Sequence, residues 1–156
     1  MEPISISGSI NINRDLQTVF NFISDYTNDP KWRKEINQTV IDTPKINVGS
    51  LLTEDSFLSK RNPHYLSYLK CTEYVADKMV KCETTSDAKF WAMNTRTVEA
   101  IDTKTTKVLY HLEFDPAIVK FGIGFQLPRF FLSYYTRSVM KDYLAVLKKN
   151  LETPKP

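Results

Sequence analysis

Residues 128–151 read PRFFLSYYTRSVMKDYLAVLKKNL, and this stretch decides the fold because it has the pattern of one long amphipathic helix. At about 100° per residue, an apolar stripe centred on Val139 is formed by Leu132, Tyr135, Tyr143, Val146 and Leu147. A basic face on the opposite side is formed by Arg137, Lys141 and Lys148. The pattern predicts that the stripe packs against the rest of the chain and that the basic face meets solvent.

The composition is typical of one globular domain, which we expect to span residues 1–156. Hydrophobic residues make up 42% and charged residues 25% of the chain, which is enough apolar material for a single core. The net charge is +3 and the basic residues are spread along the chain, so nucleic acid is not an expected partner. No window approaches the ~20 apolar residues of a membrane span, and residues 1–9 lack the pattern of a signal peptide. We therefore expect no stable membrane insertion and a cytoplasmic location.

The first part of the chain predicts one strand and two short helices. Between residues 4 and 12, isoleucines alternate with serine or asparagine, which is typical of a half-buried strand. Asn13 then stands at an N-cap position, and apolar residues follow at helical spacing up to about Asp25. Pro30 is suited to open a second short helix that includes Trp32.

From Gln38 onward the pattern is that of strands separated by turn residues. Six strands are predicted, at residues 39–43, 50–58, 65–75, 79–85, 91–101 and 106–114. Their short connections favour an antiparallel meander. The fold class is therefore α+β, with a seven-stranded antiparallel curved sheet wrapped around a long C-terminal helix and two short helices between the first and second strands.

Cys71 and Cys82 are the only cysteines, and they flank a predicted hairpin turn at residues 76–78. They would lie close together across two strands only if the turn length gives them the same face. We expect two reduced thiols, because cytoplasmic disulfides are rare and two thiols alone do not make a zinc site.

The order of elements, together with one local run, resembles a known superfamily. Asp25–Trp32 reads DYTNDPKW, which is similar to the run that follows the first helix in the bacterial polyketide cyclase/dehydrase and lipid-transport group. That group is part of the START-like or Bet v 1-like superfamily (SRPBCC), whose fold is the helix-grip fold. Residues 91–115 and 127–152 look like its closing hairpin and helix. The resemblance implies a cavity between sheet and helix for a hydrophobic small molecule, without a universal catalytic residue.

The last predicted strand offers the strongest candidate for contact with a ligand. Its inward face is formed by Val108, Tyr110, Leu112 and Phe114. Because a buried phenol normally needs a hydrogen-bond partner, a ligand carbonyl or a water would suit Tyr110, and a partner within the protein is the alternative. The preceding segment and the helix would add Phe121, Phe125, Phe131, Tyr135 and Val139 to the lining of the cavity.

The direction of the side chains in strand 91–101 depends on the turn that follows Ile101. A four-residue loop sends inward Trp91, Met93, Thr95 and Thr97, and of these we predict Trp91, Met93 and Thr97 as lining residues. A three-residue loop instead turns Arg96 inward. The first arrangement leaves the arginine in solvent, where arginines usually lie.

Residues 121–127 (FGIGFQL) connect the last strand to the helix and contain Gly122 and Gly124. Glycines permit backbone angles that other residues resist, so this segment is suited to a movable gate. A well-packed connection is the alternative.

The expected function is binding of a lipid, polyketide or isoprenoid-like molecule by a carrier or sensor. We find no metal spacing, P-loop, dinucleotide fingerprint or Ser/His/Asp set, so no catalytic residue, metal or cofactor is predicted. The alternative that the resemblance implies is a cyclase or dehydratase acting on a polyketide-like substrate, which would rely on tyrosines, Glu73 or Glu99. A third hypothesis assigns a macromolecular partner to the basic face of the helix. The sequence leaves the oligomeric state open.

Overall fold

A computed structural model describes residues 2–153 of the 156-residue chain. Its elements are, in order, β1 (Ile4–Ile12), α1 (Leu16–Ser24), η1 (Tyr26–Lys31), β2 (Ile36–Ile41), β3 (Leu51–Ser56), β4 (Tyr65–Val75), β5 (Met79–Thr84), β6 (Ala92–Asp102), β7 (Thr105–Phe114), α2 (Ala117–Ile123) and α3 (Arg129–Glu152). Within this range, no helix is long and apolar enough to cross a membrane.

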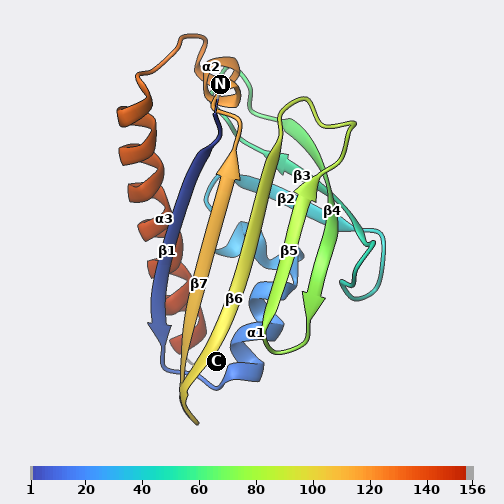
Figure 1. Ribbon diagram of the computed structural model, residues 1–156, viewed down its shortest axis with the longest axis vertical. Helices are drawn as coiled ribbons and strands as arrows, with labels where there is room; N and C mark the ends of the chain where they lie inside the picture. Colours follow the sequence, from blue (N-terminus) through green and yellow to red (C-terminus); the bar gives the residue numbers. More distant parts are fainter. Residues whose placement is uncertain (1, 154–156) are drawn as a thin grey trace.

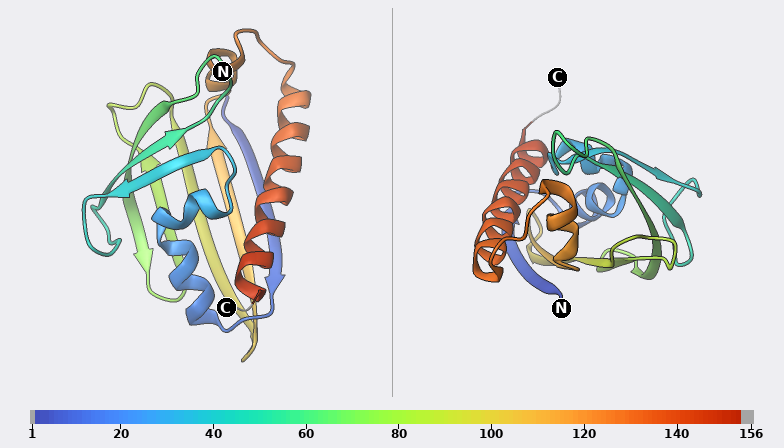
Figure 2. Two further views of the ribbon diagram at one scale, coloured as in Figure 1. Left: turned by 180° about the vertical axis from the view of Figure 1, so that it is seen from behind. Right: turned by 90° about the horizontal axis from the view of Figure 1, so that it is seen from above.

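The seven strands form one antiparallel sheet in the order β1-β7-β6-β5-β4-β3-β2. The long helix α3 lies alongside β1, at one edge of the sheet (Figure 1). Seen from above, the curved sheet and α3 surround α1 and η1, while α2 lies across one end (Figure 2). The predicted α+β helix-grip arrangement is therefore confirmed, and α2 is an additional short helix that the sequence pattern did not predict.

The two short helices begin at aspartates that cap them. Asp15 caps α1, because its carboxylate accepts a hydrogen bond from the backbone N–H of Thr18 at 3.0 Å. Asp25 caps the 3-10 helix η1 in the same way, through the N–H of Thr27 at 3.1 Å. The predicted N-cap at Asn13 is therefore wrong. The second helix also begins earlier than expected, so that Pro30 lies near its end.

The face of α3 that packs against the sheet differs from the predicted one. Its buried side chains are Leu132, Met140, Tyr143, Leu144, Leu147 and Leu151, whose mean direction is about 80° from Val139 at the helical repeat. Tyr135 and Val146 are exposed. Gly8 in β1 explains the difference, because a Cβ there would lie only 2.9 Å from Met140 Sδ. The missing side chain lets α3 approach β1 on this face.

Cys71 and Cys82 lie directly opposite each other on β4 and β5. Both are buried free thiols. They pack in a small apolar cluster with Tyr26, Ile46, Leu52, Leu69 and Val80. The two cysteines therefore share the inner face of the sheet.

Candidate ligand-binding site

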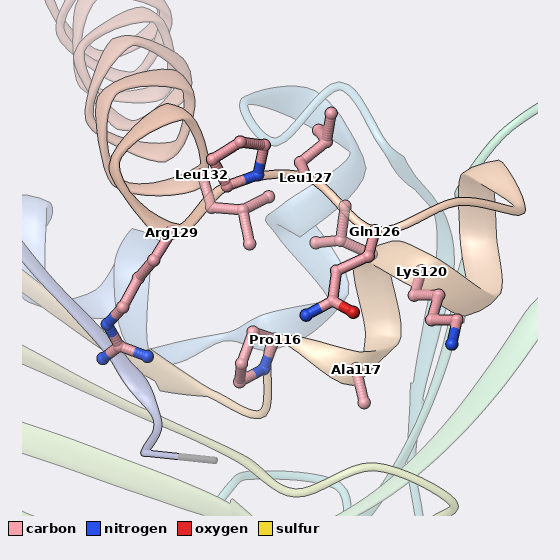
Figure 3. Close-up of a pocket in the computed structure, with 9 residues that line it drawn as sticks. Pro116, Ala117, Lys120, Gln126, Leu127, Arg129 and Leu132 are labelled. Carbon is pink, nitrogen blue, oxygen red and sulfur yellow. The ribbon is translucent and has the colours of Figure 1, made fainter.

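A pocket of about 600 Å³ lies between α2 and the start of α3. It is lined by Pro116, Ala117, Val119, Lys120, Gln126, Leu127, Pro128, Arg129 and Leu132. In Figure 3 the side chain of Gln126 extends into the middle of this space, whereas Arg129 turns away toward β1. Arg129 is held there because its guanidinium donates hydrogen bonds to the carbonyls of Glu2 and Pro3, both at 2.6 Å.

A second pocket, of about 290 Å³, lies on the other side of the same side chains. Its lining is mainly apolar and consists of Leu58, Ile118, Val119, Gly122, Ile123, Leu127, Leu132, Tyr135 and Thr136. Val119, Leu127 and Leu132 line both pockets. The two pockets are therefore neighbours, and small movements of three aliphatic side chains would change the wall between them.

The connection between β3 and β4 holds α2 in place. Ser59 Oγ donates a hydrogen bond to the carbonyl of Gly122, and Asn62 Nδ2 donates one to the carbonyl of Phe121 at 3.0 Å. Gly124 ends the helix in the left-handed conformation, with φ of 89°, which favours glycine. Residues 121–127, expected to form either a gate or a packed connection, therefore include the last turn of α2, which is hydrogen-bonded to the β3–β4 connection.

The predicted lining residues fall into three groups, of which the first lies inside the molecule. Tyr110 is fully buried, and Leu112 and Val139 pack against the same core cluster. Phe121 packs its ring against Tyr65, with ring centroids 5.8 Å apart. These residues lie between the sheet and the helices, but none of them lines either pocket around α2.

The second group lies at the start of α3 and before it. Tyr135 lines the smaller pocket, although 62% of its surface is exposed. Phe125 and Phe131 are exposed and line neither pocket. Their predicted place in a cavity is wrong. Phe131 is on the outer face of α3 because the inner face is turned toward Met140, and Phe125 lies in the exposed connection between α2 and α3.

The third group was predicted on the inner face of the sheet at β6 but lies on its outer face. Arg96 pairs with Tyr110 across the β6–β7 ladder, so these two side chains share the inner face. The odd-numbered side chains of β6, Met93 and Thr97, take the outer side. Trp91 precedes the strand, and its indole N–H donates a hydrogen bond to Glu83 on that same side. The reason is a register shift between Ala100 and Asp102, next to the turn. The predicted lining by Trp91, Met93 and Thr97 is therefore wrong, and the alternative with Arg96 inward holds.

The positive charge of Arg96 is compensated by the buried carboxylate of Asp29. The guanidinium of Arg96 is 1% exposed and donates hydrogen bonds to Asp29 Oδ1 at 2.8 Å and to Oδ2 at 2.6 Å. It also donates to the carbonyl of Ile23 at 2.7 Å. Arg33 Nη1 donates to the same Asp29 carboxylate at 3.0 Å. One aspartate thus holds two arginines inside the molecule.

Two further carboxylates complete this buried charge cluster. Arg33 donates hydrogen bonds to Glu54 and to Glu35, both at 3.2 Å. Glu73 and Glu99, the acids named from the sequence, are both exposed. The cluster of Asp29, Arg33, Glu35, Glu54 and Arg96 was missed from the sequence. A signal was present, since Asp29 and Arg33 have the i,i+4 spacing of a helical ion pair.

Two polar groups remain free next to the charge cluster. Within residues 2–153, the Tyr110 hydroxyl and Trp32 Nε1 are buried without a hydrogen-bond partner. The two rings meet edge to face at 5.6 Å, and Tyr143 lies 6.4 Å from Trp32 on its other side. Burial raises the pKa of Tyr110, although Arg33 and Arg96 oppose the shift, so this hydroxyl is a neutral donor. Tyr110 and Trp32 line neither pocket, whereas Leu132, which belongs to the same core cluster, lines both.

The charge cluster gives a pH-dependent contribution to stability. Burial raises the pKa of Glu54, and Arg33 opposes that rise only in part. An acid with a raised pKa in the folded state binds its proton more tightly there, so its contribution to stability is lost as pH rises through the folded pKa. We expect the Glu54→Gln variant to lose less stability than the unmodified protein between about pH 4 and neutral pH. Urea unfolding at a series of pH values measures this difference.

Glu152 is the control, because its pKa is lowered in the folded protein whereas that of Glu54 is raised. Hydrogen bonds from Lys148 and from the Asn13 backbone lower its pKa, so its contribution is lost as pH falls. Glu152→Gln should therefore lose less stability than the unmodified protein on acidification. If Glu54→Gln had the same pH dependence as the unmodified protein, the raised pKa of Glu54 would be contradicted.

Comparisons with solved structures identify the fold. The chain is similar to a START superfamily protein from Mycobacterium smegmatis, with a TM-score of 0.73 and 12% identity over 95% of this chain and 97% of the other. It is also similar to the Zhui aromatase/cyclase from Streptomyces sp. R1128, with a TM-score of 0.72 and 9% identity over 96% and 94% of the two chains. One half of the di-domain aromatase/cyclase BexL matches as well, with a TM-score of 0.67 and 11% identity over 98% of this chain and 51% of that chain.

The chain therefore has the START-like helix-grip fold, as the resemblance implied. No family model matches the sequence, and no curated protein matches it. At identities of 9–12%, these similarities establish the fold and assign no ligand.

Proposed function

We propose that this chain binds a hydrophobic small molecule at the pockets around α2. The observation that supports this most strongly is the pair of neighbouring pockets that share Val119, Leu127 and Leu132 at one end of the space between sheet and α3. Ligand sites for small molecules are typically concave and mainly apolar, with a volume of about 300–1,000 Å³ and a few well-placed polar groups. Both pockets have volumes close to this range.

Two buried polar groups deeper in the core would orient a ligand that extends past Leu132. Tyr110 and Trp32 each have a donor that is not used by the described part of the chain. Neither group lines a pocket around α2. A ligand would therefore bury an apolar body near Leu132 and extend a carbonyl, hydroxyl or carboxyl end into the core to accept hydrogen bonds from them. This chemistry fits a lipid, a polyketide or an isoprenoid-like compound, held by a carrier, a transport protein or a sensor.

A thermal-shift screen against fatty acids, phospholipids, quinones and polyketide-like aromatics tests the proposal. A ligand that binds only the folded state adds nearly 3 kcal/mol at about 100 times its dissociation constant. For a domain of this size, that is a rise of several degrees in Tm. We expect one chemical class to give this rise. A flat screen at saturating concentrations would contradict the proposal.

A cyclase or dehydratase activity is the second candidate. It is supported by the unpaired Tyr110 hydroxyl, and two of the structural neighbours are named as aromatase/cyclases. In this mechanism Tyr110 would donate a hydrogen bond to a substrate carbonyl and polarise it. Turnover of a polyketide-like ligand found in the screen should then fall by about 100-fold in the Tyr110→Phe variant, with its affinity retained.

Tyr143→Phe is the matched control, because Tyr143 also packs against Trp32. It should keep both turnover and affinity. Turnover that is unchanged in Tyr110→Phe would remove Tyr110 from the reaction, and the absence of turnover for every stabilising ligand would leave binding as the function.

A further inference from the structure

The first two turns of α3 expose several aromatic side chains. Phe130 is 69% exposed and Tyr134 is 76% exposed. Phe131 and Tyr135 are also exposed, and the rings of Phe130 and Phe131 stack with centroids 4.4 Å apart. Phe125, just before the helix, adds another exposed ring. We call these five residues the α3 aromatic patch.

The patch continues along the helix into positive charge. Phe130, Tyr134, Arg137 and Lys141 have the spacing i, i+4, i+7, i+11, which places them in one line on the helix. Arg137 and Lys141 are exposed. One line on α3 therefore begins with two rings and ends with two cations.

The segments on either side of the patch carry an excess of positive charge, although Asp115 precedes α2 and Asp142 follows Lys141. Residues 116–141 contain four basic residues and no acidic residue. The connection between β3 and β4, which is hydrogen-bonded to α2, adds Lys60 and Arg61, and residues 57–63 contain no acid. Arg61 lies at the end of α2, since a Cβ on Gly124 would be 2.5 Å from its Nη1.

We propose that the α3 aromatic patch docks this protein on the surface of an anionic lipid bilayer. Exposed rings partition into the boundary between headgroups and acyl chains, and nearby lysines and arginines are attracted to anionic headgroups. Both components are present on one convex face of α3, and a bilayer would satisfy them together without a shaped partner surface. The binding is peripheral, because no helix of the described chain can span the membrane.

Docking would bring the smaller pocket to the bilayer. Tyr135 belongs to the patch and also lines that pocket. A hydrophobic ligand could then pass between bilayer and pocket without crossing water. Loading of this kind rests on the proposed function, whereas docking itself depends only on the patch and its charges.

Sedimentation with lipid vesicles tests the docking. The protein should sediment with vesicles of mixed phosphatidylcholine and phosphatidylglycerol, less with phosphatidylcholine alone, and less as salt is raised. The double variant Phe130→Ser/Tyr134→Ser should bind the mixed vesicles at least about tenfold more weakly, because it removes two rings from the contact. Val40→Ser/Ile101→Ser is the matched control, since these apolar residues are also about half exposed but lie outside the patch.

The charges are tested with a second matched pair of variants. Arg137→Glu/Lys141→Glu should weaken binding to the mixed vesicles by more than about twentyfold, at roughly fivefold or more per charge. Lys104→Glu/Lys107→Glu makes the same change in net charge at the β6–β7 turn, which lies far from the start of α3 (Figure 1). This control should bind within about twofold of the unmodified protein.

Three results would overturn the proposal. One is a folded protein that does not bind the mixed vesicles, and another is equal loss of binding in the patch and control variants. The third is a dimer in solution that Phe130→Ser/Tyr134→Ser dissociates while vesicle binding is unchanged, since a second copy of the chain would then cover the patch. Phe130 and Tyr134 line neither pocket around α2. The Phe130→Ser/Tyr134→Ser variant should therefore still be stabilised by soluble ligands. If no ligand stabilised even the unmodified protein, the proposed function would fail, whatever the result with vesicles.

Discussion

Asp29→Asn is expected to lower the free energy of unfolding by about 3–5 kcal/mol. The substitution keeps the shape of the side chain but removes the charge that compensates Arg96 and Arg33. Asp29 is fully buried and Arg96 is almost so, so neither arginine can turn toward water without a rearrangement of the core. Breaking a buried pair by removing one partner leaves an uncompensated charge, which is why the loss should be large. Urea unfolding monitored by circular dichroism measures it.

Asp55→Asn is the matched control for this prediction. Asp55 Oδ2 lies 2.9 Å from Nδ1 of His64, but the side chain of His64 is 72% exposed. Even a charged pair at an exposed site contributes only about 0–1 kcal/mol, so this variant should unfold nearly as the unmodified protein does. The combined variant Asp29→Asn/Arg96→Met should recover part of the stability lost in Asp29→Asn, because it removes one of the stranded cations. A loss below about 1 kcal/mol for Asp29→Asn would contradict the role assigned to this cluster.

Val119→Trp is expected to weaken binding of an apolar ligand by at least about tenfold. Val119 lines both pockets around α2, so the larger side chain would occupy volume that the ligand needs. Overpacking costs typically about 1–3 kcal/mol, which the fold should tolerate and circular dichroism would check. Isothermal titration with a ligand from the screen measures the affinity.

Gln126→Trp provides a second test that does not change the core. Its side chain is exposed and extends into the larger pocket (Figure 3), so the substitution would fill that pocket from its open side. Val146→Trp is the control, because Val146 is an exposed residue of α3 that lines neither pocket. If both pocket variants bound the ligand as tightly as the control, the ligand would lie elsewhere.

The sheet and the long helix could be predicted because each has a strong hydrophobic period. Residues 4–12 alternate clearly, and the strands at residues 4–12 and 65–75 were both predicted with their observed bounds. The helix of residues 129–152 was predicted almost in full. Periodicity of this kind depends on local sequence, which is why it determines the type and order of the elements.

The direction of side chains depends on features that periodicity does not contain. A one-residue shift near Ala100 turned Arg96 inward and sent Thr97 outward. The close approach at Gly8 changed which face of α3 is buried. Each is a local irregularity with a large effect, since it reverses or rotates a whole set of side chains.

The candidate site was predicted only in part for the same reason. Tyr110 and Leu112 lie on the strand with the clearest alternation, and the structure places both on its inner face. Asp29 lies in the DYTNDPKW run, which indicated the fold but not its ion pairs. Its function as the partner of Arg96 depends on residues 67 positions apart in sequence, which only the folded chain brings together.

NMR titration of the labelled protein tests the central claim most directly, with the compound that gives the largest rise in Tm as the ligand. If the pockets around α2 hold the ligand, chemical-shift changes should be concentrated in α2, at Leu58 and in the first turns of α3, and the Trp32 indole N–H should shift with them. Changes that are confined to the outer face of the sheet, or that are spread evenly over the chain, would contradict binding at this site.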